Sequence, residues 1–66
     1  MECVRWVVYE HSGNKEIVVA RGQPHLCKLK GISTKRAMYY WNTLATGKTL
    51  DEAKKNYAKR IEREMG

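Results

Sequence analysis

A chain of 66 residues and 7.7 kDa can form one small domain, and a chain of this size buries only about 60% of the surface that it exposes when unfolded. The apolar share of 42% and the charged share of 30% are ordinary for a folded protein and exclude extensive disorder. The formal net charge of +6 favours an anionic partner.

Neither membrane insertion nor export is expected from this sequence. No run approaches the 18 or so apolar residues of a membrane-spanning helix, and the first residues lack the basic and apolar regions of a signal peptide. We therefore expect a cytoplasmic location and no membrane partner. Cys3 and Cys27 are too few for a disulfide framework, so we expect both to be reduced and to pack as small buried side chains.

The first third of the chain predicts an antiparallel β-hairpin over residues 3–20. Segments 3–10 (CVRWVVYE) and 15–20 (KEIVVA) are rich in β-branched and aromatic residues. The intervening HSGN is a turn sequence in which Gly13 and Asn14 tolerate positive φ. Apolar side chains occur on both faces of the first strand, so at least one face is expected to pack on helices.

The segment 24–47 predicts two short helices joined by a turn. Pro24 suits the first turn of a helix, and Gly31 ends that helix. Ser33 or the threonine that follows it caps a second helix, which we expect to run to about residue 46 and to be closed by Gly47. The centre of the chain is therefore helix-turn-helix-like.

Residues 50–65 predict an amphipathic C-terminal helix. Thr49 and Glu52 form a capping box before it. Apolar residues then recur at intervals of three and four, namely Leu50, Ala53, Tyr57, Ile61 and Met65. The opposite side carries cations that are either a solvated face or an extension of an anion-binding surface, namely Lys55, Lys59 and Arg63. The whole chain, residues 1–66, is predicted as a single α+β domain in which the hairpin packs on two or three helices.

The positive charge is concentrated in the middle of the chain. All seven acidic residues lie at or before residue 16 or at or after residue 51, whereas residues 17–50 contain six cations, a number equal to the net charge of +6. These cations are Arg21, Lys28, Lys30, Lys35, Arg36 and Lys48. A neutral scaffold with a concentrated basic segment is typical of proteins that bind phosphate backbones.

The predicted second helix has an apolar side and a polar side. The apolar side, which we expect to face the core, consists of Ala37, Met38, Trp41, Leu44 and Ala45. The polar side presents Lys, Tyr, Asn and Thr, which contact base edges and phosphates when a helix enters the major groove. We predict phosphate contacts from Lys28, Lys30, Lys35, Arg36 and Lys48, and contacts to bases or sugars from Tyr39, Asn42 and Thr43.

The stretch LCKLKGISTKRAMYYWNTLATGKTLDEAKK (26–55) resembles the helix-turn-helix repeat of the nuclease-associated modular DNA-binding domains of phage and intron-encoded homing endonucleases. In both, a short helix, a Gly-Ile-Ser turn, a helix with Lys, Tyr and Arg, a glycine and an S/T-L-E-E-A-like box follow in that order. The second helix is about one turn longer here than in the usual repeat. The resemblance implies that Thr34, Lys35, Arg36, Tyr39 and Asn42 lie at DNA.

A third strand over residues 24–31, in place of the first helix, is the alternative. In that arrangement the chain is similar to the arm-binding N-terminal domains of phage integrases, which contact DNA with one face of a sheet. The resemblance then implies that Arg5, Val7 and Tyr9, or the opposite face of their strand, meet the groove.

The sequence thus predicts a small DNA-binding protein, a phage or mobile-element regulator or accessory factor whose partner is double-stranded DNA. A homodimer would add stability to so small a core. One alternative is an inhibitor that docks on an acidic protein partner through exposed Tyr and Trp, and another is an RNA-binding protein. Exposed tyrosines remote from the cations would favour the inhibitor, whereas cations around Asn42 would favour DNA.

No catalysis and no cofactor are expected. No nucleophile is paired with a base, and the carboxylates are too scattered for metal-assisted cleavage of a phosphodiester. The possible zinc ligands Cys3, His11, His25 and Cys27 lack the short paired spacings of structural zinc sites, so we expect no metal.

Overall fold

The structure is a computed structural model that describes residues 5–65; Cys3 and Val4, at the start of the predicted hairpin, lie outside the described residues. The elements are β1 (Trp6–His11), β2 (Ile17–Ala20), α1 (Gln23–Lys30), α2 (Thr34–Tyr40), β3 (Trp41–Gly47) and α3 (Leu50–Met65). The three strands form one antiparallel sheet in the order β2-β1-β3. The predicted α+β class, with a hairpin packed on helices, is confirmed.

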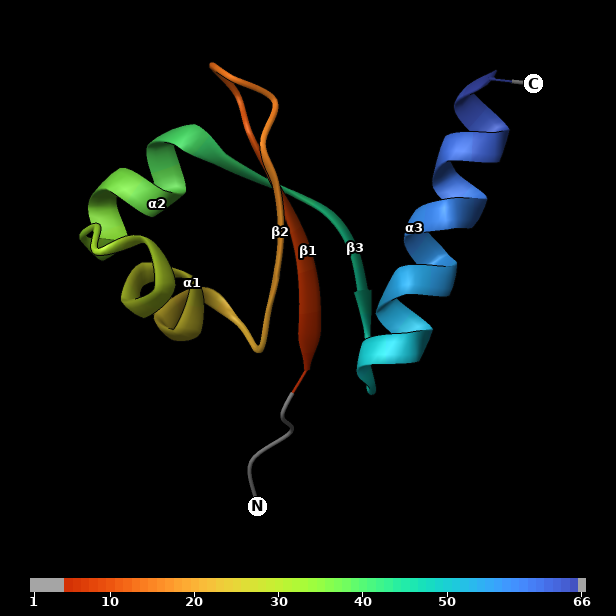
Figure 1. Ribbon diagram of the computed structural model, residues 1–66, viewed down its shortest axis with the longest axis horizontal. Helices are drawn as coiled ribbons and strands as arrows, with labels where there is room; N and C mark the ends of the chain where they lie inside the picture. The colour runs from red at the N-terminus through yellow and green to blue at the C-terminus, as the bar shows by residue number, and fades with distance from the viewer. Residues whose placement is uncertain (1–4, 66) are drawn as a thin grey trace.

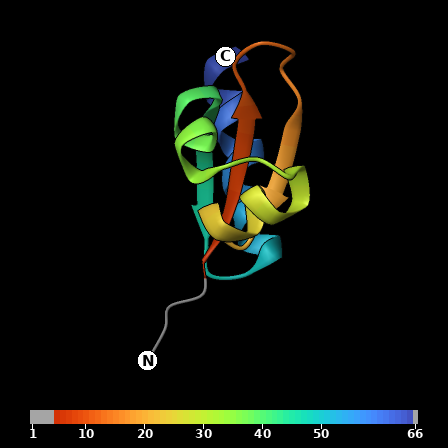
Figure 2. The same cartoon turned by 90° about the vertical axis from the view of Figure 1, so that its left-hand side faces the viewer.

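The sheet lies between two helical layers. In Figure 1, α1 and α2 cover one face and α3 covers the other, and Figure 2 shows the same order from the side, with α1 and α2 in front of the strands. The Cα atoms span 35 × 34 × 14 Å, so the molecule is a flat disc. Among the described residues, no helix is both long enough and apolar enough to cross a membrane.

Strand β1 is buried on both faces because each face has its own helical layer. Val7 and Tyr9 belong to the core beneath α1 and α2, which consists of Val7, Tyr9, Ala20, Leu26, Ala37 and Trp41. Val8 alternates to the opposite face, where α3 lies, and is 0% exposed. This double coverage explains why neither face of the predicted strand is polar.

The hairpin turn is held by side chains rather than by glycine. His11 Nδ1 accepts hydrogen bonds from the N–H groups of Gly13 (3.1 Å) and Asn14 (3.3 Å), and Asn14 Oδ1 accepts one from the N–H of Glu16 at 2.9 Å. The positive φ that the turn requires occurs at Lys15 (61°). Gly13 and Asn14, which tolerate positive φ, are thus not the residues of the turn that adopt it.

The predicted signals around α1 and α2 are confirmed. Pro24 lies in the first turn of α1, and Gly31 ends that helix in the left-handed conformation with φ of 64°. Ser33 caps α2, since its Oγ accepts the N–H of Arg36 at 3.2 Å. Because residues 23–30 are helical, the alternative of a third strand over 24–31 is wrong, and a different segment completes the sheet.

The second helix ends about six residues earlier than predicted, at Tyr40, and the chain continues as β3. The segment 41–47 (WNTLATG) mixes the strand formers Trp and Thr with the helix formers Leu and Ala, so its composition alone does not decide between helix and strand. It pairs with the free edge of β1, from Trp6 opposite Gly47 to His11 opposite Trp41. Met38, predicted to be in the core, lies on α2 but is 71% exposed, and Gly47 ends a strand instead of a helix.

Helix α3 begins and ends as predicted. Thr49 Oγ1 accepts the N–H of Glu52 at 3.1 Å, which is the first half of the predicted capping box. Ala53 is fully buried and Tyr57 and Ile61 are half-buried, as the predicted apolar stripe requires. Met65, the last residue of that stripe, extends beyond the sheet and is exposed.

Two side chains of α3 cover the outer edge of β3. Asn56 Nδ2 donates to the carbonyl of Thr46 at 2.7 Å, and Arg60 Nη1 donates to the carbonyl of Leu44 at 2.9 Å. Leu44 is the extra residue of a β-bulge, because it lies between the partners of Val8 and Tyr9 in the register. Carbonyls that an edge strand would leave free are thus satisfied within the molecule.

Candidate nucleic-acid interface

Helix α2 is anchored by one small side chain and exposes the rest. Of its seven described residues, Ala37 alone is buried. Tyr39 is 79% exposed and Tyr40 is 40% exposed, and Lys35 and Arg36 precede them on the same helix. Large apolar side chains left in solvent beside cations are a feature of interaction surfaces, since packing does not explain them.

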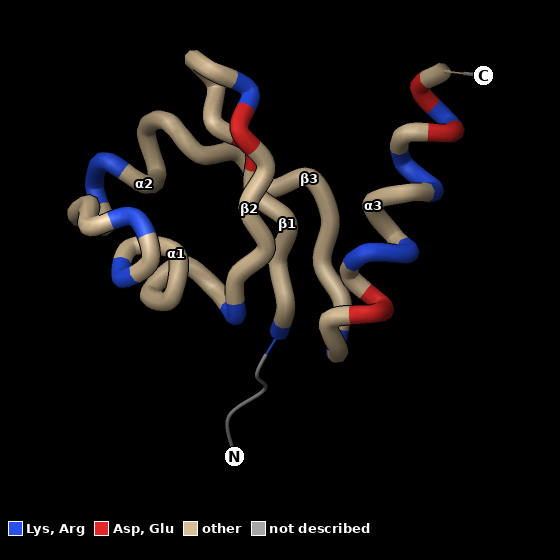
Figure 3. The backbone as a smooth tube through the Cα atoms, viewed as in Figure 1, with Lys and Arg blue, Asp and Glu red and all other residues tan. Residues whose placement is uncertain are grey.

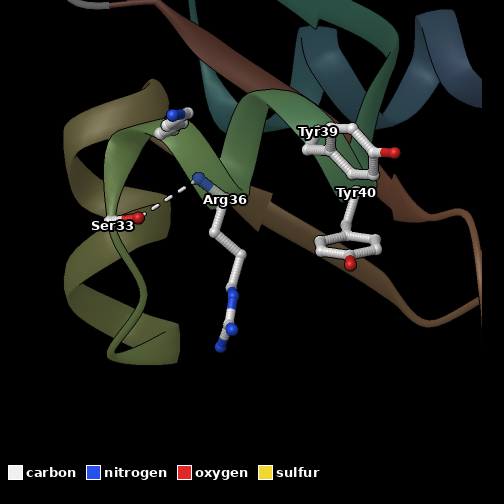
Figure 4. Close-up of a pocket in the computed structure, with 5 residues that line it drawn as sticks. Ser33, Arg36, Tyr39 and Tyr40 are labelled. Carbon is white, nitrogen blue, oxygen red and sulfur yellow. Dashed lines mark hydrogen bonds between the residues drawn. The ribbon is translucent and has the colours of Figure 1, made fainter.

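The exposed side of α2 forms a shallow pocket of about 340 Å³, which we call the α2 pocket. It is lined by Ser33, Lys35, Arg36, Tyr39 and Tyr40 and is drawn in Figure 4. Lys35 precedes Tyr39 by four residues, and Arg36 precedes Tyr40 by four residues. Each cation therefore lies one helical turn before a tyrosine ring. Among residues 5–65, no carboxylate lines this pocket.

The two tyrosine rings continue an aromatic chain that starts in the core. The Tyr39 and Tyr40 centroids are 4.9 Å apart with planes at 71°. Tyr40 stacks on His11, with centroids 5.7 Å apart and planes at 12°, and His11 meets the edge of buried Trp41 at 5.0 Å. The contacts with His11 and Tyr39 therefore restrict the Tyr40 ring before any ligand binds. We expect Tyr40 to lose little conformational entropy when a ligand packs on it.

The hairpin turn holds this chain in place. The N–H of Ser12 donates to the carbonyl of Tyr40 at 2.8 Å, which ties the turn to the end of α2. His11 Nδ1 accepts hydrogen bonds from two backbone N–H groups, which orients the imidazole ring. His11 was expected to be solvated; its place beside Tyr40 depends on the pairing of His11 with Trp41, which no local pattern indicates.

Lys30 is near the α2 pocket, but its charge is already engaged. Its ammonium forms an ion pair with Glu16 and lies 5.6 Å from the centroid of the Trp41 ring. Lys30 thus links α1 to the hairpin and to the core. Because its ammonium already interacts with Glu16 and Trp41, it attracts an anionic ligand less strongly than a free lysine does.

The nine predicted contacts fall into separate groups. Thr34, Lys35, Arg36 and Tyr39 lie together on α2, and exposed Lys28 lies on the neighbouring α1. Figure 3 shows that the layer of α1 and α2 carries Lys and Arg and no acidic residue. Asn42 and Thr43 are exposed on β3, where Asn42 pairs with Glu10.

Lys48 is remote from α2. It follows Gly47, which pairs with the first residue of β1, whereas α2 ends beside the last residue of β1. Seven residues of strand at about 3.3 Å each separate the two ends of β3 by roughly 20 Å. The structure therefore brings together the predicted residues of α2 and does not bring Lys48 to them.

The basic residues of α3 lie on the opposite side of the sheet from α2, as the colouring of the backbone in Figure 3 shows. Lys55, Lys59 and Arg63 are exposed, and Arg60 contacts Leu44 and Glu64. The cations of α3 cannot line the same pocket as those of α2, because the three-stranded sheet lies between them.

No protein-family model, no curated protein and no solved structure matches this chain. The resemblance to the helix-turn-helix repeat therefore stays a prediction, and the function is inferred from the residues of the site.

Proposed function

We propose that this protein binds nucleic acid through the α2 pocket, with DNA as the expected polymer and regulation or an accessory role as the expected task. The observation that carries the proposal is the pairing of two cations with two exposed, braced tyrosines in a pocket without a carboxylate among the described residues. Cations contact phosphates, and aromatic rings contact sugars and bases.

A protein-binding inhibitor is the second candidate, and exposed Met38 and Leu29 on the same layer favour it. The tyrosines, however, are not remote from the cations as that alternative requires: Tyr9 is buried, and Tyr39 and Tyr40 line the pocket with Lys35 and Arg36. Asn42 lies on β3 opposite Glu10 and not among the cations of α2, so the support for nucleic-acid binding comes from the α2 pocket.

The test is fluorescence anisotropy of labelled duplex DNA, single-stranded DNA and hairpin RNA over a salt series. Contacts to two or three phosphates predict a log–log salt slope of about −2 to −3. We expect the double variant Lys35→Met/Arg36→Met to bring the slope closer to zero by about 1.5.

A matched control removes the same charge from the other side of the sheet. Lys54→Met/Lys55→Met changes two exposed cations of α3, so it lowers the net charge equally without touching the α2 pocket. Because Lys30 already forms an ion pair with Glu16, Lys30→Met is expected to lower the affinity for nucleic acid less than Lys35→Met does. Equal losses from both double variants, or no binding to any nucleic acid at low salt, would overturn the proposal.

A further inference from the structure

We infer that the ligand of the α2 pocket is an unpaired strand, one base of which stacks on the Tyr39 ring beside Tyr40, and that the protein prefers single-stranded nucleic acid to duplex. This inference rests on the proposed function and specifies its ligand.

The shape of α2 does not suit the reading of a duplex. The helix has seven residues, so it is about 10 Å long. Asn42 and Thr43, which would have read bases from a longer helix, instead lie on β3. The last two residues of α2, Tyr39 and Tyr40, place large rings next to the start of β3, where a helix that reads base edges would carry polar side chains.

The α2 pocket has the size and lining that a single base requires. Its volume of about 340 Å³ is near the lower limit of small-ligand pockets, roughly 300 Å³. In Figure 4 the side chain of Arg36 projects beside the Tyr40 ring, and the Tyr39 ring lies next to Tyr40. A base can insert here only if it is not already stacked and paired inside a duplex.

Preorganisation favours stacking at this position. His11 covers one face of Tyr40 in a nearly parallel stack and is itself fixed by two backbone N–H groups. Tyr39 is 79% exposed and, among residues 5–65, contacts another ring only edge-on at Tyr40, so its faces are available to a base. Each stacked base adds to affinity without regard to its identity, because every base has a π face.

Charge completes the argument for a polyanion. Lys35 and Arg36 both line the pocket and each lies one turn from a ring, so a strand with a base on Tyr39 has phosphates within reach of the cations. An acidic peptide would satisfy the cations but has no group that needs the rings, which makes it the natural competitor in the test.

The experiment measures affinity for four probes of equal length: a mixed-sequence 12-mer single strand, its duplex, the same strand with abasic sites throughout, and poly-glutamate. The proteins are the wild type, Tyr39→Ala, Tyr39→Trp and the control Met38→Ala. Met38 is also exposed on α2 but does not line the pocket. Both substituted positions, Met38 and Tyr39, are exposed to solvent, and circular dichroism verifies that each variant folds.

We expect the wild type to bind the single strand at least about tenfold more tightly than the duplex, and the abasic strand about 5- to 100-fold more weakly than the normal one. Tyr39→Ala should weaken the affinity for the normal strand by a similar factor. It should leave the affinity for the abasic strand unchanged. Tyr39→Trp should retain binding, and Met38→Ala should be unchanged.

The outcomes separate this inference from the proposed function. If the duplex binds as tightly as the single strand and Tyr39→Ala has no effect, while Lys35→Met/Arg36→Met still weakens binding, the unpaired-base inference fails and nucleic-acid binding stands. If poly-glutamate binds as tightly as the single strand, both fail, because the pocket then recognises charge alone. A single strand of RNA that outcompetes its own duplex supports the inference for either sugar.

Discussion

Replacement of Gly47 by alanine tests how closely α3 packs on the sheet. Gly47 ends β3 where the first turn of α3 crosses it. A Cβ at this position would lie 2.4 Å from the backbone nitrogen of Ala53, 2.8 Å from the carbonyl carbon of Glu52 and 2.9 Å from Ala53 Cα. All three atoms belong to the backbone of a helix, so no side chain can rotate to make room.

The magnitude follows from these distances. Overpacking in a well-packed region costs about 1–3 kcal/mol, and contacts this short with rigid backbone favour the upper part of that range. A core of this size supplies about 3–5 kcal/mol in total. Gly47→Ala is therefore expected to remove most of the stability of the fold.

Gly31→Ala is the informative comparison. Gly31 has a positive φ of 64° but nothing within 4 Å of its built Cβ, so the substitution strains the backbone without a collision. A left-handed alanine costs about 1–2 kcal/mol. In urea unfolding followed by circular dichroism, with a slope of about 1 kcal/mol per M, we expect midpoint losses of about 3 M for Gly47→Ala and 1–2 M for Gly31→Ala. An equal or smaller loss for Gly47→Ala would refute this account of the contact with α3.

Three further predictions concern the edge, the core and the cap. Arg60→Met removes the donor to the Leu44 carbonyl and should cost about 1 kcal/mol in urea unfolding. Burial, and then the neighbouring Cys27 thiol, raises the pKa of Tyr9 above its ordinary value. The folded state thus holds this proton more tightly than the unfolded state does. The resulting stability is complete below about pH 10 and is lost as the pH rises through the pKa of the folded state. Tyr9→Phe should therefore reduce the fall of the urea midpoint at alkaline pH. Ser33→Ala removes the cap of α2 and should cost about 1 kcal/mol, with faster hydrogen exchange of the α2 amides.

Each of these has a matched check. Arg63→Met changes the same residue type on the same helix at an exposed position, and an equal loss there would contradict the role of the bulge contact. An alkaline profile that is identical with and without the Tyr9 hydroxyl would contradict the sign derived for its pKa. Unchanged amide exchange in Ser33→Ala would mean that tertiary contacts, and not the cap, hold α2.

The features that could be predicted from the sequence are those with local causes. Pro24, Gly31, Ser33 and Thr49 act within a few residues of themselves, and each begins or ends a helix where expected. The hairpin follows equally from two strand-forming runs around a turn.

Strand β3 could not be predicted in the same way, because its conformation is decided at a distance. Residues 41–47 contain apolar positions that fit a helical face, but the free edge of β1 offers a ladder of hydrogen bonds that the helix cannot match. The candidate site depends on this strand as well. The site residues on α2 were predicted, whereas Asn42 and Thr43 lie on β3 instead of a helix. His11 was missed because only the pairing of β1 with β3 brings Tyr40 next to it.

The place of β1 at the centre of the sheet sets an order of assembly. Its hairpin partner β2 follows within a few residues, whereas its other partner β3 comes 30 positions later, counted from His11 to Trp41. Closing the longer loop carries the larger entropic cost, so we expect the hairpin and the α1–α2 pair to form before β3 docks. Until α3 also arrives, the apolar side of the hairpin around Val8 has no cover, and a nascent or truncated chain that ends before residue 50 would present it to other chains.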